Sequence, residues 1–116
     1  MTTQTTSSLR ILKGDPLYES LRLGDRDAYE RAARGRDAID LSDCDLRGCD
    51  LRHVDPHHVV LRGAYLRDCD LRGLDLRDSD LAGCSLRNAK VGGTWFPDRI
   101  PAAEIALSLT HGTRLR

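Results

Sequence analysis

The feature that most constrains this chain is an apolar residue, usually leucine, that recurs every five residues. Five steps of about 100° turn a helix by about 140°, and five steps along a strand place successive leucines on opposite faces. Neither straight element can therefore bury the series. Its members are Leu41, Leu46, Leu51, Leu61, Leu66, Leu71, Leu76, Leu81, Leu86, Val91 and Phe96. With Pro56 at the remaining central position, twelve pentads tile residues 39–98.

Each pentad has the composition of a short extended segment followed by a corner. A small or apolar residue lies two positions before most central residues, as on one face of a strand. The last pentad position is Gly at 48, 63, 73, 83 and 93 and Asp or Asn at 43, 68, 78, 88 and 98. Because these residues tolerate tight turns, the pattern predicts a chain that winds in a coil.

The repeats CDLRG (44–48), CDLRH (49–53) and CDLRG (69–73) resemble the A(D/N)LXX units of the pentapeptide-repeat proteins. The resemblance implies a β-solenoid, namely a right-handed quadrilateral β-helix with four pentads per coil, here in about three coils. It also implies that the central residues and those two before them point inward. Pro56 occupies one central position and has no N–H to donate, so we expect an irregular first coil around His53–His58.

The flanking segments are expected to cap the solenoid, because an uncapped repeat stack exposes its core at both ends. We expect a flexible N-terminus over 1–14, a helical cap over 15–38, the solenoid over 39–98 and a helical cap over 99–116. Leu107 and Leu115 have no evident place on the inner face of the last helix. Either they make one more contact within the chain, or the chain forms a homodimer through its C-terminal helix.

Outward positions suggest two candidate interaction sites. Arg47, Arg67 and Arg87 should lie above one another in the coil register. They form either an anion or acidic-partner site or a surface of Asp–Arg pairs, each worth about 0–1 kcal/mol. Trp95 takes the outward position that Asp55 and Asp75 hold in earlier coils, so it is either covered by the C-terminal helix or anchors a partner.

Two further residue groups have both a structural and a chemical interpretation. The cysteines, at 44, 49, 69 and 84, all occupy inward positions, where they act as buried thiols unless the stacked Cys49 and Cys69 form a redox-labile pair. His53, His57 and His58 lie in the segment HVDPHH, whose spacing matches no zinc signature. That segment is an irregular polar loop or a surface metal site, and we expect neither a metal nor any other cofactor.

The charge balance disfavours direct contact with nucleic acid. Residues 39–98 carry 11 Asp, 7 Arg and 1 Lys, a net charge of −3. The resemblance also suggests a function, because members of the quinolone-resistance branch of the family resemble DNA in shape and charge and bind DNA gyrase. Three coils rise about 14 Å, over which duplex DNA carries about 8 negative charges. A net charge of −3 does not reproduce that density of negative charge. Regulation of DNA gyrase by DNA mimicry is therefore the alternative function and not the main one.

No nucleophile, phosphate-loop or dinucleotide motif is present, so we expect no enzyme activity. No apolar run reaches the length of a membrane span, and Met1–Arg10 lacks the apolar centre of a signal peptide. We therefore expect a cytoplasmic protein that does not bind membranes. The function that fits best is a non-catalytic protein–protein interaction or scaffold module whose partner is another, unidentified protein.

Overall fold

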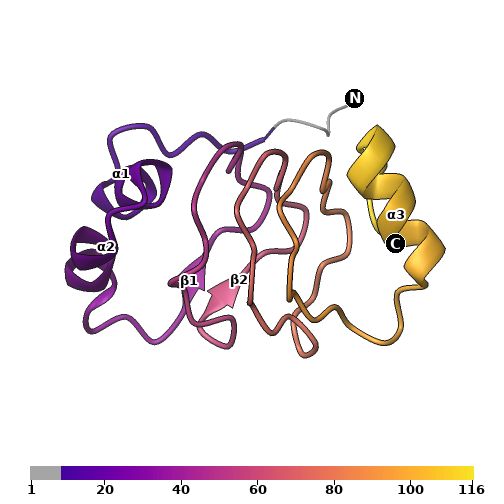
Figure 1. Cartoon of the computed structure of the whole chain (residues 1–116). Helices are drawn as coiled ribbons and strands as arrows, with labels where there is room; N and C mark the ends of the chain where they lie inside the picture. The colour runs from indigo at the N-terminus through magenta and orange to yellow at the C-terminus, as the bar shows by residue number, and fades with distance from the viewer. Residues whose placement is uncertain (1–8) are drawn as a thin grey trace, which may run out of the picture.

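The computed structural model describes residues 9–116. It contains three helices and, between the second and the third, a series of short backbone segments that pair in parallel. Helices α1 (Pro16–Leu23) and α2 (Arg26–Ala33) precede the repeats, and α3 (Ala102–His111) follows them. The strands β1 (Ile39–Asp40) and β2 (Val59–Val60) belong to the repeats. Figure 1 shows the ribbon winding in successive loops between the N-terminal helix pair and α3.

The loops are held together by parallel backbone pairing at a constant separation. β1 pairs with β2, with Ile39 opposite Val59. Parallel bridges join further pairs of residues, namely Asp45 with Tyr65, Tyr65 with Ser85, Asp50 with Asp70, Asp70 with Lys90, and Asp75 with Trp95. Each pair is twenty residues apart, which equals four pentads. Repeated parallel pairing of this kind is the connectivity of a solenoid, and residues 39–96 form a β-solenoid.

The leucines of the five-residue series fill the inside of the solenoid. All nine leucine side chains, from Leu41 to Leu86, are only 0–2% exposed. Val91 and Phe96, which continue the series, are only partly buried. The difference has a simple cause, because they belong to the last coil and no further coil packs over them.

Pro56 interrupts the pairing between the first two coils, as its missing N–H predicts. One pentad earlier, the N–H of Leu51 donates to the carbonyl of Asp70 at 3.0 Å. Within residues 9–116, no bridge joins residues 54–56 to residues 74–76. The backbone over Pro56–His58 instead forms a turn.

Most of the predicted corner positions, but not all of them, have left-handed backbone. Positive φ recurs at residues 43, 48, 63, 68, 73, 83, 88 and 93, with values between 54° and 79°. Gly83 shows why glycine suits such a corner, since a Cβ there would lie 3.2 Å from the Cα of Gly63. Asp78 and Asp98, which the sequence also assigned to corners, do not adopt positive φ.

The N-terminal helices and the segment before them cover the first coil. The Asp15 carboxylate accepts the N–H of Leu17 at 2.9 Å and so begins α1. Arg10 pairs with the edge of the first coil, donating its N–H to Asp43 and accepting that of Asp45. Arg10, which lies within the segment expected to be a flexible N-terminus (1–14), pairs there because the first coil offers a free backbone edge. Residues 1–8 of that segment lie outside the described residues.

The chain after α3 returns to the solenoid in a way that the sequence did not reveal. Gly112 ends α3 in the left-handed region, with φ of 76°. Leu115 then exchanges two backbone hydrogen bonds with residues 83 and 84, and Arg114 forms an antiparallel bridge with Ser85. Leu115 is consequently buried at 2% exposure, whereas Leu107 on the outer side of α3 stays 50% exposed.

Candidate functional site

The outer surface of the solenoid is dominated by Asp–Arg pairs within single pentads. In four pentads an Asp carboxylate accepts hydrogen bonds from both the backbone N–H and the guanidinium of the Arg two residues later, with guanidinium–carboxylate distances of 2.7–3.0 Å. The spacing explains this, because Asp and Arg flank the inward leucine and so lie on one face. The pairs are Asp45–Arg47, Asp50–Arg52, Asp70–Arg72 and Asp75–Arg77.

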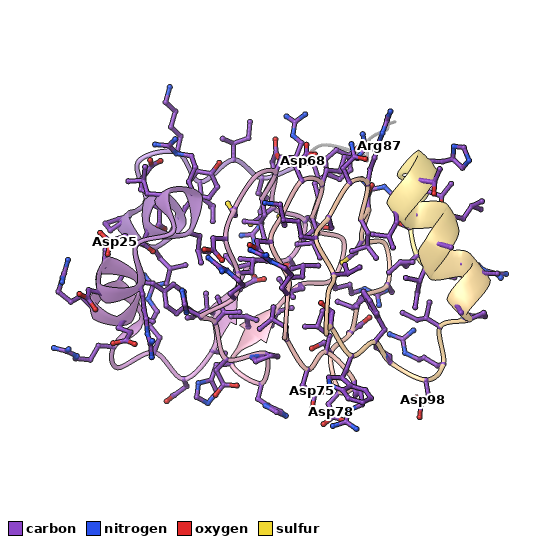
Figure 2. All side chains as sticks on the ribbon, viewed as in Figure 1. Asp25, Asp68, Asp75, Asp78, Arg87 and Asp98 are labelled. Carbon is purple, nitrogen blue, oxygen red and sulfur yellow. The ribbon has the colours of Figure 1, made fainter. Side chains whose placement is uncertain are left out.

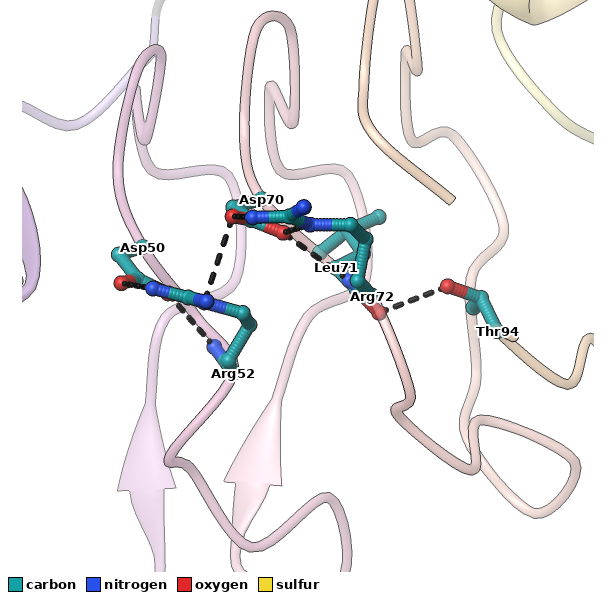
Figure 3. A network of polar contacts seen from close by, with 6 residues as sticks. All are labelled: Asp50, Arg52, Asp70, Leu71, Arg72 and Thr94. Atoms are coloured by element: carbon teal, nitrogen blue, oxygen red, sulfur yellow. Dashed lines mark hydrogen bonds and ion pairs between the residues drawn. The ribbon is translucent and has the colours of Figure 1, made fainter. Parts of the chain in front are cut away.

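Some ion pairs join neighbouring coils, and the pair that Arg52 makes with Asp70 is one of them. Figure 3 shows the guanidinium of Arg52 between Asp50 of its own coil and Asp70 of the next, with its Nε 3.3 Å from the second carboxylate. Asp70 also pairs with Arg72 at 2.7 Å. The side-chain hydrogen bond from Arg72 lowers the pKa of Asp70 to about 2. Asp70 is thus ionised and neutralised in place.

The three arginines of the expected column have different environments and do not form one anion site. Arg47 is paired with Asp45 at 2.8 Å. Arg67 is only partly exposed, and its Nε donates to the hydroxyl of Ser85 at 2.9 Å. Arg87 is exposed and makes no ion pair or side-chain hydrogen bond among residues 9–116. Figure 2 places Arg87 at the end of the solenoid that faces α3.

The partial burial of Arg67 reflects a polar cluster under the C-terminal segment that the sequence did not reveal. Two guanidinium groups lie close to the Tyr65 ring, that of Arg67 at 4.5 Å and that of Arg114 at 5.1 Å from its centroid. The fully buried Ser85 hydroxyl donates to the carbonyl of Gly112 at 2.8 Å. These contacts fasten the C-terminal segment to the solenoid.

Trp95 is the prominent aromatic residue of the surface. Its side chain is 59% exposed, so α3 does not cover it. The Arg77 guanidinium lies 5.0 Å from its ring centroid. Arg77 is in turn fixed by Asp75, whose pKa its hydrogen bonds lower to about 2. Asp75, Asp78 and Asp98 lie along the same edge of the molecule in Figure 2.

The histidine segment places two imidazole rings close to neighbouring carboxylates. His57 lies 3.3 Å from Asp55 and 3.6 Å from Asp78, and His58 lies 3.6 Å from Asp55. His53 is exposed. Among the described residues, no group of three or more His, Cys, Asp or Glu side chains is arranged to hold a metal ion.

The cysteines are free and buried. The Cys69 thiol donates to the carbonyl of Leu46 at 2.8 Å, and the Cys84 thiol donates to that of Leu61 at 2.9 Å. Burial raises the pKa of Cys49 and of Cys84 to about 12. These thiols are therefore protonated, unlike the thiolate that a catalytic cysteine supplies.

The depressions of the surface are shallow and open. One, of about 430 Å³, is lined by arginines that already have partners, such as Arg62, which pairs with Asp80 at 2.9 Å. A second, of about 460 Å³, lies beside the outer side of α3 and includes Leu107. In the described part of the chain, no helix is both long and apolar enough to cross a membrane.

Comparison with known proteins bears on the repeats themselves. A search of curated proteins and a search of solved structures found no match. The family model for pentapeptide repeats matches residues 39–78 and 60–96, with eight copies of the repeat. Together these ranges cover half of the 116 residues. With its buried leucines at every fifth position and its parallel pairing at twenty residues, the chain belongs to the pentapeptide-repeat family.

Proposed function

We propose that this protein is a non-catalytic protein–protein interaction or scaffold module built on a right-handed quadrilateral β-helix of about three coils. The pairing separation of twenty residues and the corners at five-residue intervals support that geometry. In this proposal, 15–38 and 99–116 are caps, and 39–98 presents the binding faces.

The observation that carries the proposal is the exposure of Trp95. Trp95 is 59% exposed, and its ring lies beside the guanidinium of Arg77, which Asp75 holds in place. Tryptophan and arginine are enriched among the residues that contribute most to binding at protein interfaces. The solenoid supplies a rigid support, since the leucines beneath it are fully buried. A fixed, exposed Trp–Arg pair is well suited to anchor another protein.

Affinity capture from cells that express the chain naturally tests this function. The wild-type chain is compared with Trp95→Ala and with Leu23→Ala, a control at a residue of α1 that is 68% exposed. We expect a defined protein to be retained by the wild type and by Leu23→Ala and to be lost with Trp95→Ala. Retention of the same proteins by all three chains would refute the role of Trp95.

The alternative, regulation of DNA gyrase by DNA mimicry, is less well supported by the surface charges. A DNA mimic needs a dense array of unneutralised negative charge. Here Asp45, Asp50, Asp70 and Asp75 are each neutralised by an Arg two residues away. The same pairing argues against direct nucleic-acid binding, because those arginines are occupied. A supercoiling assay that responds to excess protein would revive the alternative.

A homodimer through α3 is a further proposal, supported by the exposure of Leu107 beside an open depression. Light scattering after size exclusion, for the wild type and Leu107→Asp, tests it. A dimer that becomes a monomer with the variant supports the proposal. We also propose a cytoplasmic location, because four free, buried thiols fit a reducing compartment. We further propose that the protein does not associate with membranes and uses no cofactor.

A further inference from the structure

At the end of the solenoid that faces α3, only half of the backbone edge is hydrogen-bonded to the C-terminal cap. In the coil below, the N–H groups of Leu71, Gly73 and Leu76 and the carbonyls of Cys69 and Leu74 pair with the last coil. The equivalent groups of the last coil, twenty residues later, have no hydrogen-bond partner among residues 9–116. They are the N–H groups of Val91, Gly93 and Phe96 and the carbonyls of Ala89 and Thr94.

In the other half of the same coil the backbone groups are hydrogen-bonded, because the C-terminal segment packs against them. The N–H of Leu86 donates to the hydroxyl of Ser108 at 2.9 Å, and that of Asn88 donates to the carbonyl of Leu109 at 3.0 Å. Leu115 satisfies residues 83 and 84 in the same way. Among residues 9–116, the hydrogen bonds of the cap thus stop at residue 88 and leave the backbone edge over residues 89–96 unpaired.

We call residues 89–96 the open edge. Its side chains, like its unpaired backbone groups, suit contact with another chain. Val91 and Phe96 point inward but are only partly buried, so apolar surface accompanies the unpaired donors. A free edge with adjacent apolar side chains accepts an added strand from another chain. An added strand would take the place of the next coil.

The positive charge of the open edge favours an added strand with acidic side chains. The outward column reads Asp50, Asp70, Lys90, so the acidic series ends in a cation. Residues 87–96 contain Arg87 and Lys90 and no Asp or Glu. An acidic side chain above Lys90, flanked by small or apolar residues above Ala89 and Val91, would repeat the arrangement of the earlier coils. A second copy of the same edge would instead bring like charges together.

We propose that the open edge binds an extended segment of a partner protein in which apolar residues alternate with acidic ones. This inference rests on the proposed function as an interaction module and names the kind of partner it takes. The segment pairs its backbone with residues 89–96 and places its acidic side chain beside Lys90.

Titration of the full chain with two synthetic peptides, ADLEGADLE and its basic counterpart AKLRGAKLR, tests the proposal. Trp95 is the chain's single tryptophan and belongs to the open edge, so its fluorescence reports binding. We expect the acidic peptide to bind at least tenfold more tightly than the basic one. Equal binding of the two peptides, or no response to either, would overturn the proposal.

Three variants separate the backbone contribution from the charge contribution. Val91→Pro removes one edge donor at the central position that Pro56 already occupies in the first coil, and we expect at least a tenfold loss of affinity with an unchanged circular dichroism spectrum. Lys90→Glu keeps the edge donors and should reverse the preference between the peptides. Lys13→Glu, an equal charge change at an exposed residue before α1, should leave both affinities unchanged.

Two further results would count against the open edge specifically. A dimer that Val91→Pro dissociates would show that a second copy occupies it. A captured partner that depends on Trp95 but not on Val91 or Lys90 would leave the interaction module intact and remove the open edge from it. Failure of this inference is thereby distinguished from failure of the proposed function.

Discussion

The hydroxyl of Ser108 in α3 lies 2.9 Å from the backbone nitrogen of Leu86 in the last coil. In the coil below, the equivalent nitrogen of Leu66 donates to the carbonyl of Ser85 at 2.8 Å. A side chain from α3 thus replaces the backbone acceptor that a further coil would supply. The same hydroxyl donates to the carbonyl of Thr113 at 2.6 Å, so one buried serine joins the solenoid, α3 and the C-terminal segment.

Ser108→Ala should therefore destabilise the fold more than an ordinary surface change. It leaves the N–H of Leu86 buried without an acceptor, which costs about 1–3 kcal/mol. Urea denaturation followed by circular dichroism measures this loss. Thr110→Ala, at an exposed residue of the same helix, is the control and should change the free energy of unfolding by about 0.5 kcal/mol or less. Equal effects of the two variants would contradict the assigned role.

Replacement of a central leucine should have a larger effect. Leu71 is 0% exposed, and Leu71→Ala should lower the free energy of unfolding by about 2–5 kcal/mol, through lost apolar burial and the cavity left behind. Val60→Ala is the matched control, because Val60 is an outward residue of the repeats with 42% exposure. The difference between the two denaturation midpoints measures the effect. A small loss in both would mean that the leucine series is not the core.

The repeats were predictable from the sequence because every pentad repeats the same local arrangement. Leucine at every fifth position excludes a straight helix or strand, the resemblance to pentapeptide repeats implied the solenoid, and Pro56 marks the position where one donor is missing. The Asp–Arg pairs also followed from their spacing around the leucine. These features depend on residues that are close in sequence or separated by a fixed number of residues.

The ends of the solenoid were less predictable, because their contacts follow no period. Arg10 pairs with the first coil and Leu115 with the last through backbone groups, which any residue possesses. The repeat pattern predicted that Arg67 lies in a column with Arg47 and Arg87. Its guanidinium instead donates hydrogen bonds to Ser85 and Gly112 and so points toward the cap. The periodic pattern gives no information about such contacts. The exposure of Trp95 likewise depended on where α3 crosses the last coil.

Acid should destabilise the protein through its Asp–Arg pairs. The pKa of Asp70 is about 2, below its ordinary 3.8, because of its hydrogen bonds with Arg72. The stability from this pair is fully present above about pH 4 and is lost as the pH falls through 2. The melting temperature should therefore fall over that range. Asp70→Asn should show a smaller fall, because it lacks this titrating carboxylate.

Asp98→Asn is the control for this experiment, since Asp98 forms no ion pair among residues 9–116. Its melting temperature should follow that of the wild type at each pH. Added salt should reduce the difference between the wild type and Asp70→Asn near pH 7, because exposed charges are screened. If all three chains show the same acid dependence, the Asp70–Arg72 pair does not contribute to it.

The four cysteines should be unreactive in the native protein, because all of them are buried. Burial raises the pKa of Cys49 and Cys84 to about 12, so at pH 8 only about one thiol in ten thousand at either site is the reactive thiolate. A chromogenic disulfide reagent should therefore titrate no thiol before unfolding and four in denaturant. Thr110→Cys, which adds an exposed thiol on α3, should react at once with one equivalent. Rapid oxidation of Cys49 and Cys69 in the native wild type would instead show that this stacked pair is redox-labile.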